Sequence, residues 1–588
     1  MEKAYVDEDK ILKVMASLSF IFITAALILI RNHSPAVGYE ISIYSALPSS
    51  VWILLILAIF CGISIVVYCS FKSKSFWIVG FFSLILVNFI TLSLQFFRGY
   101  FVYGLSDPLG HLERTYSIVS AGFFGNNFYP VVHVLGAILV EVCNIVPETV
   151  IKIIPIIFTI LFMLFTYLLA SVVSYKREHA ILAAAVGSVP LFSYYHLTVY
   201  PHGLSILTFP LLFYLYFKVL KTPSFSSKMA LIVVLLLFPF FHPVIESILI
   251  LCLVIVGLVI AGAKQIQIGQ LHSFIEHTTM ESALISIIAF FTWISYFAAF
   301  GISIQRISSW IGGEAPVIAR ATEVQHTLNR SIWQGIELLF KMYGHNIVFF
   351  ACSLIALILI VKRILQRQAE IINFLIFSVI FIVCTLAYFF VSMALGLITW
   401  GRFLGANIGT FAIPVFASFA LYQIRNPKRF KLGVLMVVLI LTMSSAVGIF
   451  SIYRSPWIYQ TNWQITRMDI SGSSWLNIHS VEGFDYEPMG WQGVYRDPYI
   501  PEHFGNPEYV SVGMFVKENT YLVITERFKQ VSLNSALKGW INMPWYFARP
   551  GFDKGDFARV RMDPSANELY SNGEFEVLLI VPLRGSKI

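Results

Sequence analysis

The chain contains a long series of apolar segments, most of roughly 20 residues, separated by polar stretches. An α-helix of that length crosses the ~30 Å hydrocarbon core of a bilayer, and its backbone hydrogen bonds are satisfied within the helix. Only 12% of the 588 residues are charged, roughly half the usual fraction in a soluble protein, and the mean hydropathy is +0.77. The sequence therefore predicts a polytopic, mostly α-helical membrane protein.

Hydropathy predicts about thirteen transmembrane helices. A short charged stretch, MEKAYVDEDK, precedes the first apolar run, and that run is too long for the core of a cleavable signal peptide. We therefore expect the first helix to be retained. The predicted spans lie at 11–30, 51–70, 76–97, 149–173, 180–198, 204–220, 229–241, 244–262, 282–300, 346–361, 371–396, 403–423 and 432–452.

Lysine and arginine residues gather beside the ends of these spans and indicate the orientation of the chain. Cytoplasmic loops of membrane proteins carry an excess of both residues. If the thirteen spans alternate in direction, every cluster falls on the same side of the membrane. We therefore expect a multi-pass protein of the cell membrane whose N-terminus is cytoplasmic and whose C-terminus lies outside. The clusters are Lys10/Lys13, Lys72/Lys74, Lys176/Arg177, Lys221/Lys228, Lys264, Lys362/Arg363/Arg367 and Arg425/Lys428/Arg429/Lys431.

Two segments on the predicted outer side, 98–148 and 301–345, are too long to be simple turns. Both contain apolar residues interspersed with polar ones in amphipathic patterns, which predicts helices that lie in the outer interface plane. These residues are Leu109, Leu112, Tyr116 and Val119 in the first segment, and Trp310, Ile311, Ile318, Trp333, Ile336 and Leu339 in the second.

The composition changes after the last span. We expect a transmembrane module over residues 1–453 and a small mixed α/β domain outside the membrane over residues 454–588. Strand signals in the second part end with an Asn-Gly turn of the hairpin kind at Ser571–Glu574. The predicted strands are Tyr509–Val516, Tyr521–Thr525, Ala558–Met562 and Phe575–Val581.

The first outer segment carries an unusually polar stretch, SDPLGHLERT. Asp107-Pro108 is a favourable helix start, because Asp is preferred at the N-cap and Pro at the first helical position. His111 follows Asp107 by four residues and is therefore expected on the same face of that helix. Glu113 and Arg114 lie on neighbouring faces, where they are either solvated or part of the same site.

Three further polar groups are predicted at the outer ends of spans. FHPVIES places His242 and Glu246 four residues apart, YYHLTVYPH carries His202, and TWGRFLG places Arg402 at the mouth of a late span. Ionisable residues at such depth are costly and are therefore suspected of function. Together with the Asp107 segment, these groups indicate a shared cavity at the outer interface.

Sugar transfer from a polyprenyl phosphate suits such a cavity. The isoprenoid tail of the donor lies in the bilayer, its phosphate at the interface and its sugar outside. Asp107 would deprotonate the acceptor hydroxyl as it attacks the anomeric carbon, with inversion. Arg402 would stabilise the charge that develops on the departing phosphate, and the histidines would position phosphate or sugar hydroxyls.

The chain resembles the GT-C glycosyltransferases, polytopic enzymes that use lipid-phosphate sugars, and in particular their archaeal members. The resemblance rests on Asp107 early in the first large outer loop, on FYPVVHVLGAIL with Tyr129 and His133, and on GRFL with Arg402. It implies that Asp107 is the catalytic base and that Arg402 contacts the donor phosphate. Two features depart from the family pattern. Asp107 lacks an adjacent acidic partner, and the Trp-Trp-Asp-Tyr-Gly signature of oligosaccharyltransferases is missing.

The sequence leaves other functions open. The main alternative is a transporter or flippase of a lipid-linked or small anionic substrate, which would favour charged pairs nearer the middle of the membrane. A glycan polymerase or ligase on another scaffold is a further alternative.

The expected partners are a polyprenyl-phosphate sugar donor, a lipid-linked glycan or protein acceptor and membrane lipids, without nucleic acid. A metal site is a separate question. Asp107, His111, His242 and Glu246 could together bind Mg²⁺ or Mn²⁺, but such spaced pairs are more often structural, so no metal ligand is assigned.

Overall fold

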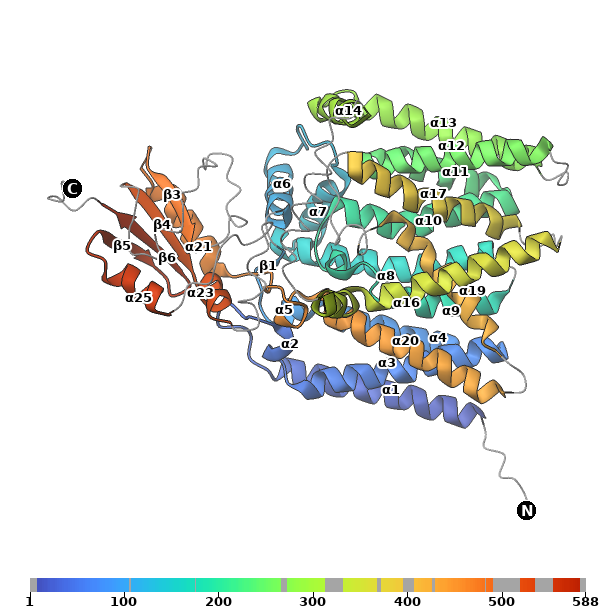
Figure 1. Ribbon diagram of the computed structural model, residues 1–588, viewed down its shortest axis with the longest axis horizontal. Coiled ribbons are helices and arrows are strands. Elements are labelled where there is room, and N and C mark those ends of the chain that lie inside the picture. Colours follow the sequence, from blue (N-terminus) through green and yellow to red (C-terminus); the bar gives the residue numbers. More distant parts are fainter. Residues whose placement is uncertain are drawn as a thin grey trace, which may run out of the picture.

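The computed structural model describes residues 8–104, 107–174, 176–265, 272–311, 332–366, 372–394, 405, 407–425, 429–481, 483–489, 519–534 and 554–581. Long helices lie side by side in a bundle, and a small β-sheet with its helices stands at one end of that bundle (Figure 1). The chain begins at the opposite end.

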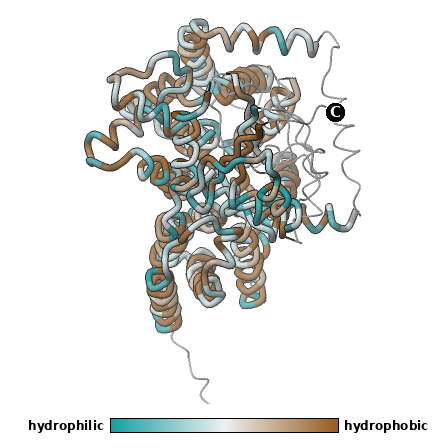
Figure 2. Tube along the Cα trace, turned by 90° about the vertical axis from the view of Figure 1, so that its left-hand side faces the viewer, coloured by the Kyte–Doolittle hydropathy of each residue, from teal (hydrophilic) through white to brown (hydrophobic). Residues whose placement is uncertain are grey.

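Nine helices in the described ranges are long and apolar enough to cross a membrane. Apolar residues predominate along the bundle, seen in Figure 2 from the end that carries the sheet. Many large apolar side chains point outwards, such as Ile21, which is 59% exposed, and Met443, which is 68% exposed. An apolar outer surface of this kind fits lipid surroundings, so the polytopic fold predicted from the sequence is confirmed. The nine helices are α1 (Glu8–Arg31), α3 (Ser49–Lys72), α8 (Pro147–Val173), α10 (Pro201–Lys221), α12 (Pro243–Gln265), α13 (His272–Ile294), α16 (Ile332–Leu365), α17 (Ile372–Ala394) and α20 (Phe430–Ile452).

Shorter helices occupy the other four predicted spans. They are α4 (Trp77–Leu92) with α5 (Leu94–Phe97), α9 (Arg177–Gly187), α11 (Phe225–Leu237) with the 3₁₀ turn η2 (Phe238–Phe240), and α19 (Ile413–Gln423) after η4 (Ile408–Ala412).

The predicted span at 180–198 was wrong as a continuous helix. It ends at Gly187, and the chain then passes through Pro190 and Ser193, which has φ +49°, into η1 (Ser193–His196). Proline lacks the amide hydrogen that a helix needs and disfavours helical geometry in the residue before it. The break leaves Tyr194 and His196 in a buried turn at the sheet end of the bundle.

The first predicted outer segment contains β1 (Val102–Tyr103), α6 (Asp107–Ala121) and α7 (Val131–Cys143). Helix α6 runs across the end of the bundle rather than along the long helices (Figure 1), as expected of an interface helix. In the second segment, α14 covers Ala298–Ile311, whereas residues 312–331 lie outside the described part of the chain. Trp333, Ile336 and Leu339 do not form a separate interface helix, because they belong to the unbroken helix α16.

Several cationic clusters gather at the end of the bundle opposite the sheet. Lys72 and Lys74 form ion pairs with Glu8 at the start of α1. Ser73, between them, donates a hydrogen bond to Glu178 in the first turn of α9. These contacts connect the N-terminus to the predicted Lys/Arg-rich side. Lys176 over Tyr422, Arg363 over Phe419 and Lys72 over Phe430 extend the same end to α16, α19 and α20.

The C-terminal part contains a four-stranded sheet in the order β3-β4-β6-β5. Its strands are β3 (Asp485–Met489), β4 (Thr520–Thr525), β5 (Ala566–Ser571) and β6 (Phe575–Ile580), and only β3 and β4 are parallel. Helices α21 (Arg467–His479), α23 (Glu526–Leu533) and α25 (Lys554–Met562) accompany it. The two-residue strand β2 (Gln464–Ile465) pairs instead with β1.

Two predicted strands, 521–525 and 575–581, and the hairpin turn at 571–574 are confirmed by β4, β6 and the β5–β6 pairing. The predicted strand at 558–562 was wrong, because these residues end helix α25. In that helix Phe557 and Val560, three residues apart, both pack into the core under the sheet. The predicted strand at 509–516 lies outside the described residues, and the boundary at residue 454 stays a prediction.

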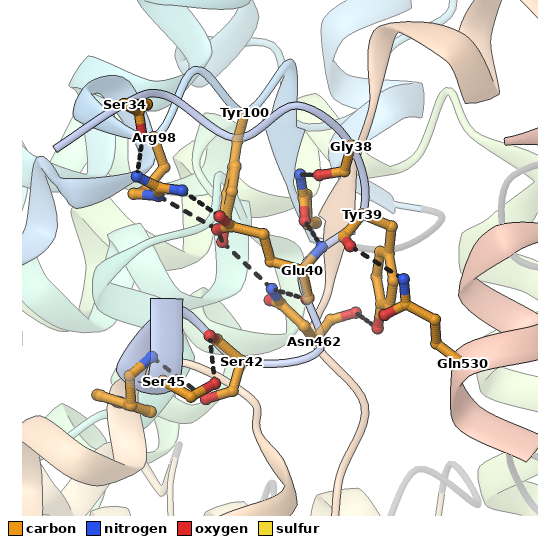
Figure 3. A network of polar contacts seen from close by, with 12 residues as sticks. Ser34, Gly38, Tyr39, Glu40, Ser42, Ser45, Arg98, Tyr100, Asn462 and Gln530 are labelled. Atoms are coloured by element: carbon orange, nitrogen blue, oxygen red, sulfur yellow. Dashed lines mark hydrogen bonds and ion pairs between the residues drawn. The ribbon is translucent and has the colours of Figure 1, made fainter. Parts of the chain in front are cut away.

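The loop between α1 and α2 (Ile43–Ala46) joins the bundle to the C-terminal part (Figure 3). Glu40 forms an ion pair with Arg98 and accepts a hydrogen bond from the Tyr100 hydroxyl at 2.6 Å. Asn462 donates to the Glu40 carbonyl at 2.7 Å. On its other side, the loop donates from the Tyr39 amide to Glu574, which follows the hairpin turn, at 2.6 Å. Both parts of the protein therefore hold the same short loop.

Glu40→Ala should lower the free energy of unfolding by about 3 kcal/mol, because it leaves the Arg98 charge buried without its partner. Heat or denaturant unfolding of the purified chain measures the change. Glu337→Gln is the matched control, since it removes only a surface i,i+4 pair with Lys341 and should leave the free energy of unfolding nearly unchanged. Equal losses in the two variants would contradict a tethering role for Glu40.

Candidate functional site

A chain of short hydrogen bonds links α6 to α7. The imidazoles of His111 and His133 are joined through Nδ1 and Nε2 at 2.9 Å, and the Nδ2 atom of Asn127 lies 2.7 Å from Nδ1 of His133. All three side chains are at least 94% buried, from relative exposures of 6%, 0% and 6%. The polar groups are thus bonded to one another in an apolar setting, as buried polar groups normally are.

The remaining contacts of Asn127 fix the direction of this chain. Its Oδ1 atom accepts from Arg114 at 3.3 Å and from the Tyr129 amide at 3.2 Å. Since Oδ1 faces two donors, Nδ2 must be the atom that donates to His133. His133 then carries its proton on Nε2 and donates it to Nδ1 of His111. Neutral His111 is left with Nε2–H as a donor for a further group.

A second set of rings, from Tyr129, His242 and His202, lies next to the His111–His133 pair. Tyr129 stacks on His242, with ring centroids 6.0 Å apart and an interplanar angle of 13°. The His242 ring meets the His202 ring edge-on at 5.4 Å. Nε2 of His202 lies 3.2 Å from the Tyr388 hydroxyl on α17. The rings therefore connect the outer segment to three of the long helices.

The ends of four helices meet at this cluster. His133 and His202 lie in the first turns of α7 and α10, His111 lies one turn into α6, and His242 immediately precedes α12. The N-terminus of a helix presents free amide groups and the positive end of its dipole. The arrangement therefore favours an anionic ligand.

The approach to α6 depends on Gly104, which has φ +114°. A Cβ at this position would lie 2.6 Å from Pro108 Cγ and 2.9 Å from Thr198 Cγ2. Only glycine allows both the backbone turn and the close packing, so Gly104 sets the position at which the Asp107 helix begins.

Burial and neighbouring charge keep the histidine pair neutral. Burial lowers the pKa of His111 well below its usual value, and His133, Arg114 and His242 lower it further. For His133, burial and the Arg114 guanidinium lower the pKa to about 4. Both imidazoles therefore act as hydrogen-bond groups rather than as cations near neutral pH.

Five of the predicted site residues are brought together: His111, Tyr129, His133, His202 and His242. Asp107 is the first residue of α6 and is exposed, and Glu113 is exposed on the same helix. Glu246 is fully buried one turn into α12, where its amide bonds the His242 carbonyl. Arg402 lies outside the described residues.

Some residues of the cluster were missed from the sequence. Asn127 and Tyr388 carry no local signal, since one lies in a polar loop and the other within an apolar run. The sequence indicates that Arg114 is either solvated or part of the site, and in the structure its guanidinium carbon lies 5.1 Å from the centre of the Tyr129 ring. His196 has a structural role instead, because its two ring nitrogens bond the Thr159 hydroxyl and the Phe192 amide.

The four residues considered for a divalent cation do not form one site. Within the described ranges, no three His, Cys, Asp or Glu side chains lie where they could share a metal ion. Nδ1 of His111 and both ring nitrogens of His133 are also already engaged in the hydrogen-bond chain. The described side chains therefore do not fit Mg²⁺ or Mn²⁺, and we derive no step through a metal.

The lowered pKa of His133 predicts acid sensitivity. The unfolded state takes up a proton near pH 6.5 and the folded state only near pH 4, so stability should fall as the pH drops through that window. The loss should approach roughly 3 kcal/mol at pH 4. Unfolding of the wild type and of His133→Gln between pH 7.5 and pH 4.5 measures it, and the variant should show a shallower slope.

Two variants sharpen this test. Asn127→Asp should raise the pKa of His133, because a carboxylate accepts from Nδ1 and stabilises the protonated ring. The pH window of acid destabilisation should then end at a higher pH, and the total loss of stability should be smaller than in the wild type. His479→Gln, which changes an exposed histidine on α21, should leave the slope unchanged. A wild-type slope in His133→Gln would refute the assignment.

No family model and no curated protein sequence matches this chain. Among solved structures, it is similar to the oligosaccharyltransferase of Archaeoglobus fulgidus in the apo form, with a TM-score of 0.45 and 11% identity over 87% of this chain and 76% of that one. It is also similar to the archaeal oligosaccharyltransferase AglB from Archaeoglobus fulgidus in complex with an inhibitory peptide and a dolichol-phosphate. There the TM-score is 0.41 and the identity 10%, over 84% and 74% of the two chains.

Proposed function

We propose that this chain is a membrane glycosyltransferase that moves a sugar from a polyprenyl-phosphate donor to an acceptor at the outer membrane face. The observation that carries the proposal is the meeting of His111, Tyr129, His133, His202 and His242 at one end of a membrane-spanning bundle. The sequence indicates these residues in three ways. His111 is indicated by its spacing from Asp107, Tyr129 and His133 by the family resemblance, and His202 and His242 by their polarity at the outer ends of predicted spans.

The positions of the charges support the orientation. The Lys/Arg clusters lie at the end opposite the histidine cluster, and such clusters face the cytoplasm in membrane proteins. The cluster and the C-terminal sheet would then face the outside of the cell membrane. A polyprenyl-phosphate donor places its phosphate at this same depth, with its tail between the lipids.

The chemistry of the cluster suits a phosphate-bearing donor. Four helix N-termini and the Arg114 guanidinium favour an anion, and His111 offers a neutral N–H donor. Tyr129 and His242 present ring faces on which a sugar can pack. Arg402, by the same proposal, contacts the donor phosphate from the late span.

The reaction would be an inverting displacement at the anomeric carbon. Asp107 takes the proton of the acceptor hydroxyl while that oxygen forms its bond to the anomeric carbon. The bond from the anomeric carbon to the phosphate oxygen breaks, and its electron pair stays on the phosphate, where arginine charge stabilises it. Exposure of Asp107 at the start of α6 leaves it accessible to an acceptor arriving from outside, a lipid-linked glycan or a protein.

Asp107→Asn should reduce sugar transfer by at least about a hundredfold, because the amide cannot take the acceptor proton. The assay offers radiolabelled dolichyl-phosphate glucose and mannose to membranes that contain the native acceptors, and follows label in lipid and protein products. Glu141→Gln, an exposed carboxylate change on α7, is the control and should retain full activity. Undiminished transfer by Asp107→Asn would exclude it as the base, and label crossing sealed vesicles without transfer would favour a flippase.

His242→Ala should raise the KM for the donor at least about tenfold, because it removes the ring that stacks on Tyr129 and contacts His202. Initial rates over a range of donor concentrations separate this effect from a change in kcat. His479→Ala provides a surface histidine control. A His242→Ala enzyme with wild-type KM and kcat would show that the cluster only supports the fold.

A further inference from the structure

Arg454, two residues after the last span, has an unusual environment. It is 4% exposed, and its guanidinium carbon lies 4.3 Å from the centre of the Tyr194 ring and 4.8 Å from that of Trp463. The two ring centroids are themselves only 4.8 Å apart. If the cation lay between the two rings, their centroids would be separated by nearly the sum of the two cation–ring distances. Both rings therefore lie on the same side of the guanidinium group.

Two of the three guanidinium nitrogens of Arg454 lack hydrogen-bond acceptors in the described residues. Within the described part of the chain, Nε and Nη1 are enclosed without a hydrogen-bond partner, and no ion pair involves Arg454. The hydroxyl of the neighbouring Ser455, which is fully buried, also has no partner there. The backbone amide of Arg454 donates to the Tyr103 hydroxyl at 2.6 Å.

The other buried arginines in the described ranges show the contrast. Arg98 is paired with Glu40 and donates to the Ser34 carbonyl. Arg527 lies 3.5 Å from Asp469 and donates to the Gln464 carbonyl. A buried charge normally has such partners, since its desolvation is otherwise uncompensated. Ring faces attract the cation, but they do not accept hydrogen bonds from its N–H groups, which point outward in the plane of the guanidinium.

The position of Arg454 connects it to the candidate active site. The Tyr194 ring lies 5.9 Å from that of Tyr200, which lies 6.4 Å from the His111 ring. Arg454 thus lies at the sheet end of the bundle, two aromatic rings away from His111.

We propose that Arg454 binds a phosphate group, at a site distinct from the histidine cluster. Two guanidinium nitrogens and the hydroxyl of the adjacent Ser455 lack acceptors, which a ligand with several acceptor oxygens would supply; phosphate provides more of them than a carboxylate. Arg454 follows the last span directly, which is the depth of lipid phosphates. The phosphate belongs to a membrane lipid or is free in solution. This site does not depend on the sugar-transfer reaction.

Thermal unfolding of the full-length protein in detergent tests the site with three probes: inorganic phosphate, dolichyl phosphate and uncharged dolichol. Both phosphate probes should raise the unfolding temperature of the wild type if the ligand is free phosphate, and dolichyl phosphate alone if it is a lipid. Arg454→Gln should weaken the apparent affinity at least tenfold. The apparent affinity of Arg454→Lys should lie between those of the wild type and Arg454→Gln, because lysine keeps the charge and loses the planar donors.

The behaviour without ligand distinguishes a binding role from a structural one. Arg454→Gln should leave the unfolding temperature of the unliganded protein unchanged or higher, since it removes an uncompensated charge. The control Arg98→Gln should lower it and keep the phosphate response. The proposal is overturned if neither phosphate probe stabilises the wild type, if Arg454→Gln responds like the wild type, or if it destabilises the unliganded protein as much as Arg98→Gln. Should Arg454→Gln not fold, Arg454→Lys and Ser455→Ala decide by loss or retention of the response.

Discussion

A helix bundle with apolar sides can hold polar side chains in number only where its helices end. The two ends of this bundle use that constraint differently. One end gathers Lys72, Lys74, Lys176 and Arg363 around the N-terminus, where they pair with carboxylates or lie over aromatic rings. The other end gathers neutral imidazoles, tyrosines and helix N-termini. Polar and charged side chains are costly in the apolar lipid core and therefore gather at the ends of the helices. The charge asymmetry and the position of the candidate site both follow from this.

At the histidine end, the hydrogen-bond chain satisfies the buried polar groups without adding charge. Asn127, held by Arg114, orients His133, which orients His111, so that the outermost N–H group has a fixed direction. A group whose orientation is set before a ligand arrives loses little free energy in reorganising. Positive potential comes instead from the helix N-termini and from guanidinium groups. A site built in this way favours an anion and still tolerates its own burial.

The sequence was informative where a single local property decides the structure. Apolar runs located the spans, polar residues at span ends located His202 and His242, and the spacing from Asp107 located His111. Local patterns failed where distant packing decides. Ala558–Met562 alternates like a strand, yet Phe557 and Val560 pack as neighbours on one helix face. Asn127, Tyr388 and Arg454 could not be selected, because their roles arise only when α7, α17 and the segment after α20 meet.

The segment after α20 also takes part in placing the Asp107 helix. Strand β2 pairs with β1, matching Ile465 with Val102, and the Trp463 carbonyl accepts from the Gly104 amide at 2.9 Å. Gly104 stands three residues before Asp107, and Trp463 lies over Arg454. Arg454 is therefore connected to the start of α6 through Trp463 and one strand pairing. The C-terminal part is consequently joined to the candidate active site through the backbone, and its removal would free the entry to α6 as well as uncover the end of the bundle.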